Sequence, residues 1–202
     1  MSLFRMDNEM LNTQKCYRAM LSALCMPGSL QKIDFAENET DFMFEVPPPV
    51  ALMSRTLLDE QVSVAACGIE SKLWLDEIIT VTGARKASMD EADYIIASSV
   101  PQLAELRSVK QGTLLFPEDG ATLIVWLDEE IKGTAGKVEI SGPGVKDSAT
   151  LHISSAMVSL LKRRGTIEFE YPLGFDLFAI GSKGFLMGLP RTSSVKIISE
   201  KA

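Results

Sequence analysis

Apolar side chains recur every three or four positions near the start of the chain, between polar and charged residues. The stripe consists of Tyr17, Met20, Leu21 and Leu24. This spacing places the four side chains on one face of a helix, so it predicts an amphipathic helix. Asn12 or Thr13 is a suitable N-cap for it, and Pro27–Gly28 is a stop signal.

Two further segments have helical periodicity in the first half of the chain. Pro47–Pro49 cannot lie inside a sheet or a helix, but it can begin a helix whose stripe, Leu52–Leu57, ends near Asp59. Leu73–Val81 is most simply a helix that Gly83 ends, although its last residues also favour a strand.

Two more helices are predicted in the second half. One is the short segment Leu103–Val109. The other is capped by Ser154 or Ser155, and its apolar face consists of Met157, Leu160 and Leu161. Lys162–Gly165 ends this helix, because cations in a last turn meet the negative end of the helix dipole and glycine follows them. An anion site at these cations is the alternative interpretation.

Three segments predict the main strands. They are Val62–Ala66, where Val62, Val64 and Ala66 alternate and the strand runs into Gly68, the short buried strand Ala92–Ala97, and Thr122–Leu127. Thr122–Leu127 is a continuous β-branched and aromatic run, as expected for a central strand that is covered on both faces. Strands that alternate with helices are typical of the α/β class, so the sequence predicts a single α/β domain over residues 1–202.

Shorter alternating pieces predict further strands, most of them in the C-terminal third. They lie at Ile33 and Phe35, at Phe42, Phe44 and Val46, at Val138 and Ile140, at Ile167 and Phe169, and within 171–180, 185–192 and 195–198. Thr150–Ile153 is either a strand or the lead into the following helix. Asp128–Lys137 is charged and contains glycine, so we expect a hairpin or a surface loop there.

A stiff turn interrupts the alternating run at Ile140. In Ile140–Val145 two glycines flank Pro143, so the backbone can reach positive φ while one φ is fixed and one donor is missing. The turn is either a simple strand end or a backbone floor for a ligand or a partner. Asp147 stands where a dinucleotide-binding loop would have its third glycine, so the pattern of such a fold is incomplete.

The composition is that of a globular protein with one sizeable core. The chain has 202 residues, of which 46% are hydrophobic and 23% are charged. Its formal charge of -7 and pI near 4.9 argue against nucleic acids and anionic membranes as partners, because their binding proteins carry a basic excess. The sequence has no run of about 18 apolar residues, and its N-terminus lacks the pattern of a signal peptide, so we expect a cytoplasmic protein.

The sequence lacks the familiar metal-binding and catalytic patterns. Cys16, Cys25 and Cys67 have no C-x-x-C spacing and His152 is the only histidine, which argues against zinc and predicts reduced, part-buried cysteines. No P-loop, G-x-S-x-G or H-E-x-x-H motif occurs. A Ser-His-Asp triad would have to use His152, which is better explained as a strand position between two apolar residues. We therefore predict no catalytic residue, metal or cofactor.

Four turns place small, stiff residues beside charged side chains. Residues of these turns, together with charged residues near them, are the candidates for a ligand or interface groove. They are Arg18, Pro27, Gly28, Asp59, Gly142, Pro143, Gly144, Pro172, Gly174, Asp176 and Arg191. Arg18 and Arg191 suit a bidentate clamp for a phosphate or phosphonate group, since guanidinium geometry matches such oxyanions. Asp176 can equally orient one of them, and each charge can instead form an ion pair within the fold.

Short motifs follow one another along nearly the whole chain. They are Q-K-C-Y-R-A-M-L-S-A with M-P-G at 14–28, L-L-D at 57–59, T-G-A at 82–84, A-D-Y at 92–94, P-E-D-G-A-T-L at 117–123, I-S-G-P-G-V at 140–145, Y-P-L-G-F-D-L at 171–177 and L-P-R-T at 189–192. In order and spacing they resemble the PhnH family, the H subunit of the bacterial carbon-phosphorus lyase system. The chain departs from the family pattern at Tyr17 and Tyr171, where phenylalanine is commoner, and at Cys25, where serine is usual.

The resemblance implies a compact α/β fold that is similar to pyridoxal-phosphate-dependent transferases but reduced. Such a fold has three layers, with a mixed central sheet flanked by helices, and has neither the cofactor nor its Schiff-base lysine. The resemblance also implies a homodimer and a core complex with the G, I and J subunits. In that system ATP-dependent activation of a phosphonate forms a ribose phosphonate triphosphate and releases adenine, and a radical subunit later cleaves the carbon-phosphorus bond. Because this chain lacks the cysteine motif of the radical subunit, the resemblance implies an accessory subunit.

Two functions are compatible with the sequence. In the first, the chain is a non-catalytic or assisting subunit that organises the lyase core, and its stiff turns form one wall of a groove at a dimer or subunit interface. In the second, it is a stand-alone enzyme or binder that holds a phosphonate or phosphorylated ligand through Arg18, Arg191 and backbone groups at Gly142 and Gly144.

Overall fold

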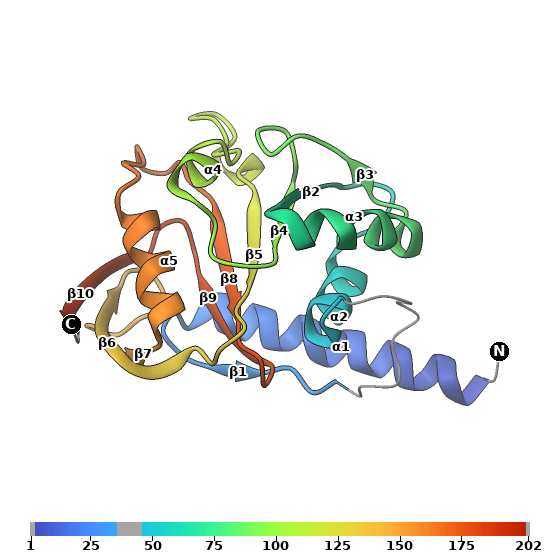
Figure 1. Ribbon diagram of the computed structural model, residues 1–202, viewed down its shortest axis with the longest axis horizontal. Helices are drawn as coiled ribbons and strands as arrows, with labels where there is room; N and C mark the ends of the chain where they lie inside the picture. Colours follow the sequence, from blue (N-terminus) through green and yellow to red (C-terminus); the bar gives the residue numbers. More distant parts are fainter. Residues whose placement is uncertain (1–2, 36–45, 201–202) are drawn as a thin grey trace.

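A computed structural model describes residues 3–35 and 46–200 of the chain (Figure 1). In chain order its elements are α1 (Leu3–Cys25), β1 (Gln31–Lys32), α2 (Pro48–Leu57), β2 (Ser63–Cys67), α3 (Ile69–Thr82), β3 (Arg85–Lys86), β4 (Tyr94–Ala97), α4 (Leu103–Arg107), the 3-10 turn η1 (Pro117–Asp119), β5 (Thr122–Trp126), β6 (Lys132–Ser141), β7 (Ala149–Ile153), α5 (Ser155–Gly165), β8 (Asp176–Ile180), β9 (Phe185–Leu189) and β10 (Ser194–Glu200). Within the described residues, the strands form a seven-stranded sheet in the order β1-β9-β8-β5-β4-β2-β3 and a three-stranded sheet in the order β10-β6-β7.

The large sheet is mixed, and β5 lies at its centre. β8, β5, β4, β2 and β3 run parallel, whereas β9 pairs antiparallel with both β8 and β1. Leu123, Ile124 and Val125 in β5 are fully buried, which confirms the prediction of a central strand covered on both faces.

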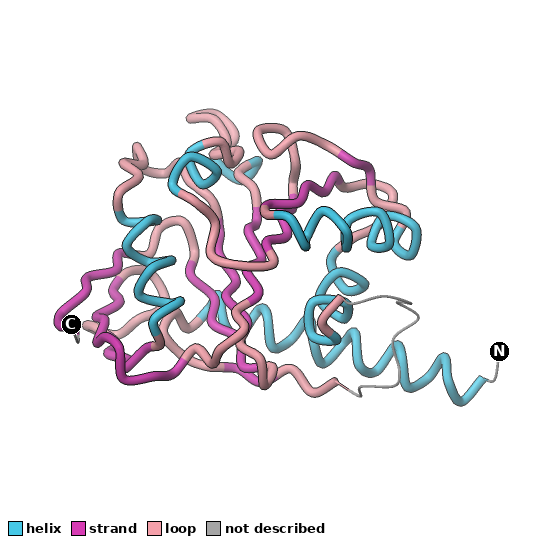
Figure 2. The backbone as a smooth tube through the Cα atoms, viewed as in Figure 1, coloured by secondary structure: helices cyan, strands magenta, loops and turns pink. Residues whose placement is uncertain are grey.

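Consecutive residues of the parallel strands point into two separate cores. Ile124 of β5 and Phe178 of β8 pack with α1, α2 and α3 on one face of the sheet. Leu123 and Leu177 pack with α4, α5 and the three-stranded sheet on the other face. α3 and α5 accordingly lie on opposite sides of β5 in Figure 1, and Figure 2 shows these helices in cyan with the strands between them. The prediction of a mixed α/β fold whose central sheet is flanked by helices is confirmed.

The prediction of a helix near the start of the chain is confirmed, but its predicted start is wrong. Neither Asn12 nor Thr13 caps it, because α1 already begins at Leu3. The hydroxyl of Thr13 donates to the carbonyl of Met10 at 3.0 Å, as hydroxyls inside helices do.

The buried face of α1 also differs from the predicted stripe. Among the side chains of α1 that the structure describes, the buried ones are Cys16, Met20 and Ala23. Tyr17 and Leu21 are 49% and 45% exposed, although they lie at helical spacing with Met20. The spacing of apolar residues alone did not reveal that α1 carries apolar side chains on a buried face and on an exposed face.

Two helix boundaries follow the rules for proline and glycine. Pro47 precedes α2 and proline occupies its first turn, where the missing N–H groups have no partner in any helix. Gly83 ends α3 with φ of 77°, and its N–H bonds to the carbonyl of Ile79. The prediction of helices at these two places is confirmed.

α5 ends at Gly165, as its sequence pattern predicts, but the group that caps its start differs from that prediction. Ser154 is the N-cap residue, but its buried hydroxyl has no hydrogen-bond partner among the described residues. The carboxylate of Glu129 takes its place, since it accepts hydrogen bonds from the hydroxyl of Ser155 and the N–H of Ala156. Glu129 lies in the loop before β6, far from α5 in the sequence, so the local sequence of the helix could not reveal this capping group.

The prediction of a hairpin or surface loop is wrong for 132–137, which belongs to β6. In this segment Gly136 pairs with Glu200 of β10 and with Ile153 of β7. A Cβ atom at Gly136 would lie 2.7 Å from Cγ2 of Val158, so α5 packs directly on the strand backbone. Two partner strands define this part of β6, and no apolar alternation marks it in the sequence.

The prediction of a strand at Ile167 and Phe169 is also wrong. The ring of Phe169 instead stacks edge to face on Phe175, with centroids 5.4 Å apart and planes at 87°. The strand at Ile33 and Phe35 lies slightly earlier in the structure, at Gln31–Lys32, and the N–H of Ile33 continues its pairing at 2.9 Å from the carbonyl of Gly184.

Most of the other predicted strands occur in the structure. Thr150–Ile153 lies in β7, and β8, β9 and β10 confirm the β-rich C-terminal third. Phe42 and Phe44 lie outside the described residues, and Val46 is buried just before α2. Among the helices of the described residues, none combines the length and the apolar character that crossing a membrane requires.

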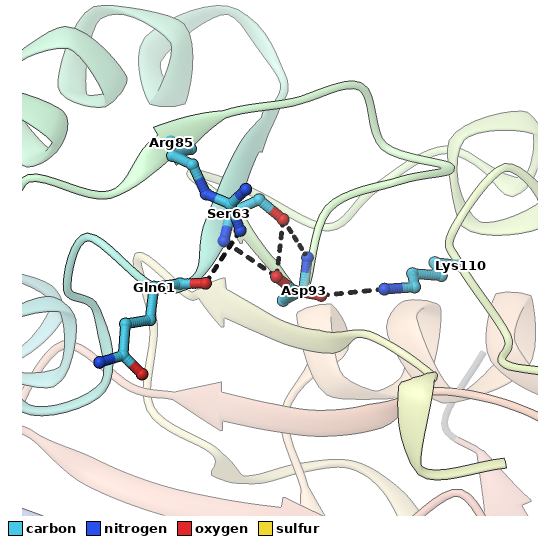
Figure 3. Close-up of polar contacts among 5 residues, drawn as sticks. All are labelled: Gln61, Ser63, Arg85, Asp93 and Lys110. Carbon is cyan, nitrogen blue, oxygen red and sulfur yellow. Dashed lines mark hydrogen bonds and ion pairs between the residues drawn. The ribbon is translucent and has the colours of Figure 1, made fainter. Parts of the chain in front are cut away.

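Polar contacts join the amino ends of the parallel strands (Figure 3). The Asp93 carboxylate, just before β4, accepts hydrogen bonds from the N–H and the hydroxyl of Ser63 in β2, at 2.9 and 2.7 Å. Lys110 donates to the same carboxylate at 2.9 Å, and its side chain comes from the segment before β5. Arg85 of β3 donates to the carbonyl of Gln61 at 2.9 Å. These contacts hold together the amino ends of the parallel strands, which lie at the opposite end of the sheet from their carboxyl ends.

Candidate functional site

The Gly142–Gly144 turn connects β6 to β7 and packs against the end of α1. Gly144 has φ of 83°, and a Cβ atom there would collide with the carbonyl of Cys25 and lie 3.1 Å from Cδ of Pro27. At Gly28 a Cβ atom would lie 3.1 Å from Cβ of Ala149, the first residue of β7. Five of the candidate residues, Pro27, Gly28, Gly142, Pro143 and Gly144, therefore lie in two turns that pack closely around the end of α1 and the start of β7.

The same turn is in contact with the segment before β10. A Cβ atom at Gly142 would lie 3.2 Å from the carbonyl oxygen of Thr192. Next to Thr192, the N–H of Arg191 donates to Oδ1 of Asp176 at 2.8 Å, and a Cβ atom at Gly174 would lie 3.2 Å from Cβ of Arg191. We call the turns at 27–28, 142–144, 172–176 and 189–192 the turn cluster, because each of them contacts another.

The side chain of Arg191 is half-buried and is bound to the backbone. One terminal nitrogen of its guanidinium donates to the carbonyl of Pro117 in η1. Asp176 receives the N–H of Arg191 and not its guanidinium. The arginine thus ties the turn cluster to the segment before β5.

Arg164, which the sequence placed at an ordinary helix end, is buried beneath the turn cluster. Only 6% of it is exposed, and its guanidinium donates to the carbonyl of Pro190 at 3.2 Å. Its charged group also lies 5.9 Å from the ring of Phe169 and 6.0 Å from that of Phe175. Burial lowers the pKa of Arg164, and the nearby Asp176 opposes this shift. The expectation that this cation meets the dipole at the helix terminus is therefore wrong for Arg164, because its side chain turns into the core.

Arg18 and Asp59 lie away from the turn cluster. Arg18 is exposed on α1, and about 10 Å of helix separates it from Cys25. Asp59 is exposed after α2, and its carboxylate accepts the N–H of Gln61 at 2.8 Å. Burial, Asp93, Asp59 and Tyr17 together raise the pKa of Tyr94, which places Asp59 near the amino end of β4. The structure thus brings nine of the predicted residues together and leaves Arg18 and Asp59 on another part of the molecule.

A second region, which the sequence reasoning missed, lies at the carboxyl ends of the parallel strands. β2 ends at Cys67 and is followed by Gly68, and β4 ends at Ala97 and is followed by Ser98 and Ser99. β2 leads through α3 to β3 on one side, whereas β4 lies on its other side. Connections that diverge between two neighbouring strands leave a crevice where open α/β sheets bind their ligands.

Two hollows open at this edge of the sheet. One has a volume of about 420 Å³, and its lining includes Gly68, Lys72 and Glu105. The other has a volume of about 500 Å³, and its lining includes Ser99, Trp126 and Arg163. The hollows adjoin, because a Cβ atom at Gly68 would lie 3.9 Å from Oγ of Ser99. The sequence signal was present in the glycine and the two serines that directly follow predicted strands.

The cysteines and the histidine are not arranged as nucleophiles or bases. Burial and the neighbouring Glu105 raise the pKa of Cys67 to about 12, and burial raises that of Cys16 to about 11. Cys25 is exposed, unlike the part-buried residue that was expected, and all three cysteines are free. His152 is exposed on β7 opposite Lys137, which confirms its interpretation as a strand position.

The family model of PhnH, described as "Bacterial phosphonate metabolism protein", matches residues 5–196. The chain belongs to the PhnH family. A relative from Stutzerimonas stutzeri, described as "Putative C-P lyase subunit protein HtxG", is 25% identical over 187 residues, which cover 91% of this chain and 86% of the relative. The PhnH match spans both the turn cluster and the carboxyl edge of the large sheet, so both regions belong to the part of the chain that characterises the family.

Proposed function

We propose that this chain is an accessory subunit of a carbon-phosphorus lyase complex that takes part in phosphonate catabolism. The observation that carries the proposal is the PhnH match over residues 5–196, together with a relative named as a lyase subunit. In this role the chain supports the ATP-dependent activation of phosphonates to ribose phosphonate triphosphate. Its partners are the G, I and J subunits, it forms a homodimer in the cytoplasm, and its fold is a reduced form of the pyridoxal-phosphate-dependent transferase fold that lacks the cofactor.

Exposed apolar side chains on α1 support a role in assembly. With Met26, which directly follows the helix, they form what we call the α1 surface, which consists of Met10, Leu11, Tyr17, Leu21 and Met26, between 45% and 70% exposed. Large apolar groups that gather on one element at the surface are typical of interaction sites. The turn cluster borders this surface, because Gly144 packs on Cys25 next to Met26. The stiff turns are thereby suited to form one wall of an interface groove, as the sequence suggested.

A second apolar surface lies on the loop before β5. It consists of Leu114, Leu115 and Phe116, which are 62%, 84% and 56% exposed, and of Tyr171, which is 78% exposed. The segments that carry them are joined, since the N–H of Gly174 donates to the carbonyl of Gln111 at 3.0 Å. We call this the loop surface. Both surfaces are proposed to be covered by other chains in the assembled complex.

The alternative function, a stand-alone binder that holds its ligand with Arg18 and Arg191, has less support. The guanidinium of Arg191 is bound to the carbonyl of Pro117, and Arg18 lies on a separate part of the molecule.

Reconstitution tests the proposal. The full chain is co-expressed with the G, I and J subunits, and we expect it to co-purify with them and to change adenine release from ATP and methylphosphonate. Tyr17→Glu and Leu115→Glu interrupt the α1 surface and the loop surface, and each is expected to reduce assembly while the isolated chain stays folded. Ile198→Glu is the matched control, because Ile198 is 48% exposed on β10, outside both surfaces. If the wild-type chain neither joins the subunits nor alters adenine release, the proposal is wrong.

A further inference from the structure

The start of α3 has a set of free hydrogen-bond donors at the crevice between β2 and β4. Gly68 is the N-cap residue, with φ of 96° and ψ of 172°, and no side chain of the described residues caps the helix. In any α-helix the first N–H groups have no partner within the helix, and here they belong to Ile69, Glu70 and Ser71. Ile69 is 84% exposed, so the end of this 14-residue helix is open to solvent.

Three serine hydroxyls converge on the same point from two elements. A Cβ atom at Gly68 would lie 3.3 Å from Oγ of Ser98, 3.5 Å from Oγ of Ser71 and 3.9 Å from Oγ of Ser99. Any side chain at position 68 would therefore fill the space in front of the hydroxyls, and its φ is one that residues with a Cβ rarely adopt. Glycine at this position keeps the crevice open.

Ser98 is the observation that points to a ligand. Only 4% of the residue is exposed, and its hydroxyl makes no hydrogen bond within the described part of the chain. The hydroxyl oxygen is not one of the fully buried atoms that lack a partner, so it remains accessible in front of Gly68, where an oxygen of a ligand can pair with it. The Ser71 hydroxyl, by contrast, already donates to the carbonyl of Cys67, which holds the turn in shape. Ser98 is free to donate toward the helix end.

The charges around the crevice are mixed. Lys72, one turn into α3, lines the same hollow as Gly68 and contributes a positive charge. Glu105 lines that hollow from α4, and Glu70 is exposed in the first turn of α3. Glu70 competes with any anion for the positive end of the helix dipole. The carboxylates of Glu70 and Glu105 weaken the binding of an anion at the crevice, so removing one of these charges should change the affinity.

We propose that the crevice at Gly68, with the first N–H groups of α3 and the hydroxyls of Ser98 and Ser99, binds a tetrahedral phosphate- or phosphonate-type oxyanion. Backbone donors at a helix start suit such groups, and hydroxyls from a neighbouring strand end complete a cradle around their oxygens. Lys72 adds charge from the side. This site is separate from Arg18, Arg191 and the turn cluster, and the proposal does not depend on assembly with other subunits.

The test is a titration of the full chain, followed by calorimetry and by the NMR signals of backbone amides. The probes are inorganic phosphate, methylphosphonate and ATP, each chosen because it carries the oxyanion in a different molecule. We expect saturable binding with amide shifts centred on Gly68, Ile69 and Glu70. A preference for methylphosphonate assigns the site to phosphonates, a preference for ATP assigns it to nucleotides, and equal binding assigns it to the oxyanion alone.

Two variants locate the binding. Ser98→Ala removes a hydroxyl that has no partner among the described residues, so the fold is expected to be preserved while affinity is expected to fall roughly tenfold. Glu70→Gln removes the competing carboxylate and is expected to tighten binding roughly two- to threefold. Ser54→Ala is the matched control, because the buried Ser54 hydroxyl on α2 also lacks a partner among the described residues. The proposal is overturned by an absence of saturable binding below about 10 mM, or by Ser98→Ala binding as tightly as the wild type.

Discussion

Replacing Asp93 by asparagine removes the charge that joins β2, β4 and the segment before β5. The carboxylate accepts two hydrogen bonds from Ser63 and one from Lys110, at 2.9, 2.7 and 2.9 Å. Asparagine can keep part of the contact with Ser63, because its amide oxygen still accepts a hydrogen bond. It loses the ion pair with Lys110 and the strengthening that a charge gives to both bonds from Ser63.

The loss of stability expected for Asp93→Asn is smaller than for a fully buried carboxylate, because the side chain of Asp93 is partly exposed. Hydrogen bonds to charged groups contribute about 1.5–3 kcal/mol when buried, but the side chain of Asp93 is 37% exposed, where solvent weakens ion pairs. We expect Asp93→Asn to lower the free energy of unfolding by about 1–2 kcal/mol, which corresponds to a melting temperature lower by roughly 3–6 °C. Asp119→Asn, at an exposed position of η1, is the control and should leave the melting temperature unchanged.

The same contacts predict a pH dependence. Partial burial acts to raise the pKa of Asp93, but hydrogen bonds from Lys110 and Ser63 outweigh it and lower the pKa below its ordinary value of 3.8. A carboxylate whose folded pKa is lowered stabilises the fold above its unfolded pKa, and the effect is lost as pH falls through the folded pKa. The stability difference between the wild type and Asp93→Asn should be full at neutral pH and shrink below about pH 4. Urea unfolding followed by circular dichroism, at neutral pH and below about pH 4, measures this stability difference. Equal differences at both, or no difference at neutral pH, would refute the reasoning.

Three further predictions concern the turn cluster and the thiols. Gly144→Ala meets the carbonyl of Cys25 and an unfavourable φ of 83°, so it should lower the free energy of unfolding by about 1–3 kcal/mol, whereas Gly165→Ala, with no atom within 4 Å of its Cβ position, should be neutral or stabilising. Arg164→Met keeps the volume but leaves backbone carbonyls unpaired, so a melting temperature lower by roughly 4–8 °C is expected; an unchanged value would mean that the buried charge has no structural role. Iodoacetamide should label the exposed Cys25 in the native protein and spare Cys67, whose pKa is raised to about 12; mass spectrometry of the peptides decides.

Much of the fold could be predicted from the sequence wherever short-range rules decide the structure. The apolar run at 122–127 needed two covered faces, and β5 lies at the centre of the large sheet. Proline before α2 and Gly83 after α3 mark helix ends because each restricts or frees the backbone at its own position. Family membership was also readable, since the motifs keep their order and spacing along the chain.

The candidate site was only partly predictable. The glycine and proline turns were recognised one by one, and their local chemistry does not show that Gly142 meets Thr192 or that Gly144 meets Cys25. The burial of Arg164 was missed because its position at the end of a helix gives no sign of which way the side chain turns.

The sequence by itself determined most of the helices and strands, the stiff turns and the family, because backbone restrictions and apolar runs act over a few residues. Tertiary structure alone decided which turns meet, how β6 extends through 132–137, and that Gly68 and Ser98 lie at one crevice. These two residues are brought together by the parallel pairing of β2 with β4, a contact between distant parts of the chain. Such contacts depend on the whole fold, and no local pattern encodes them.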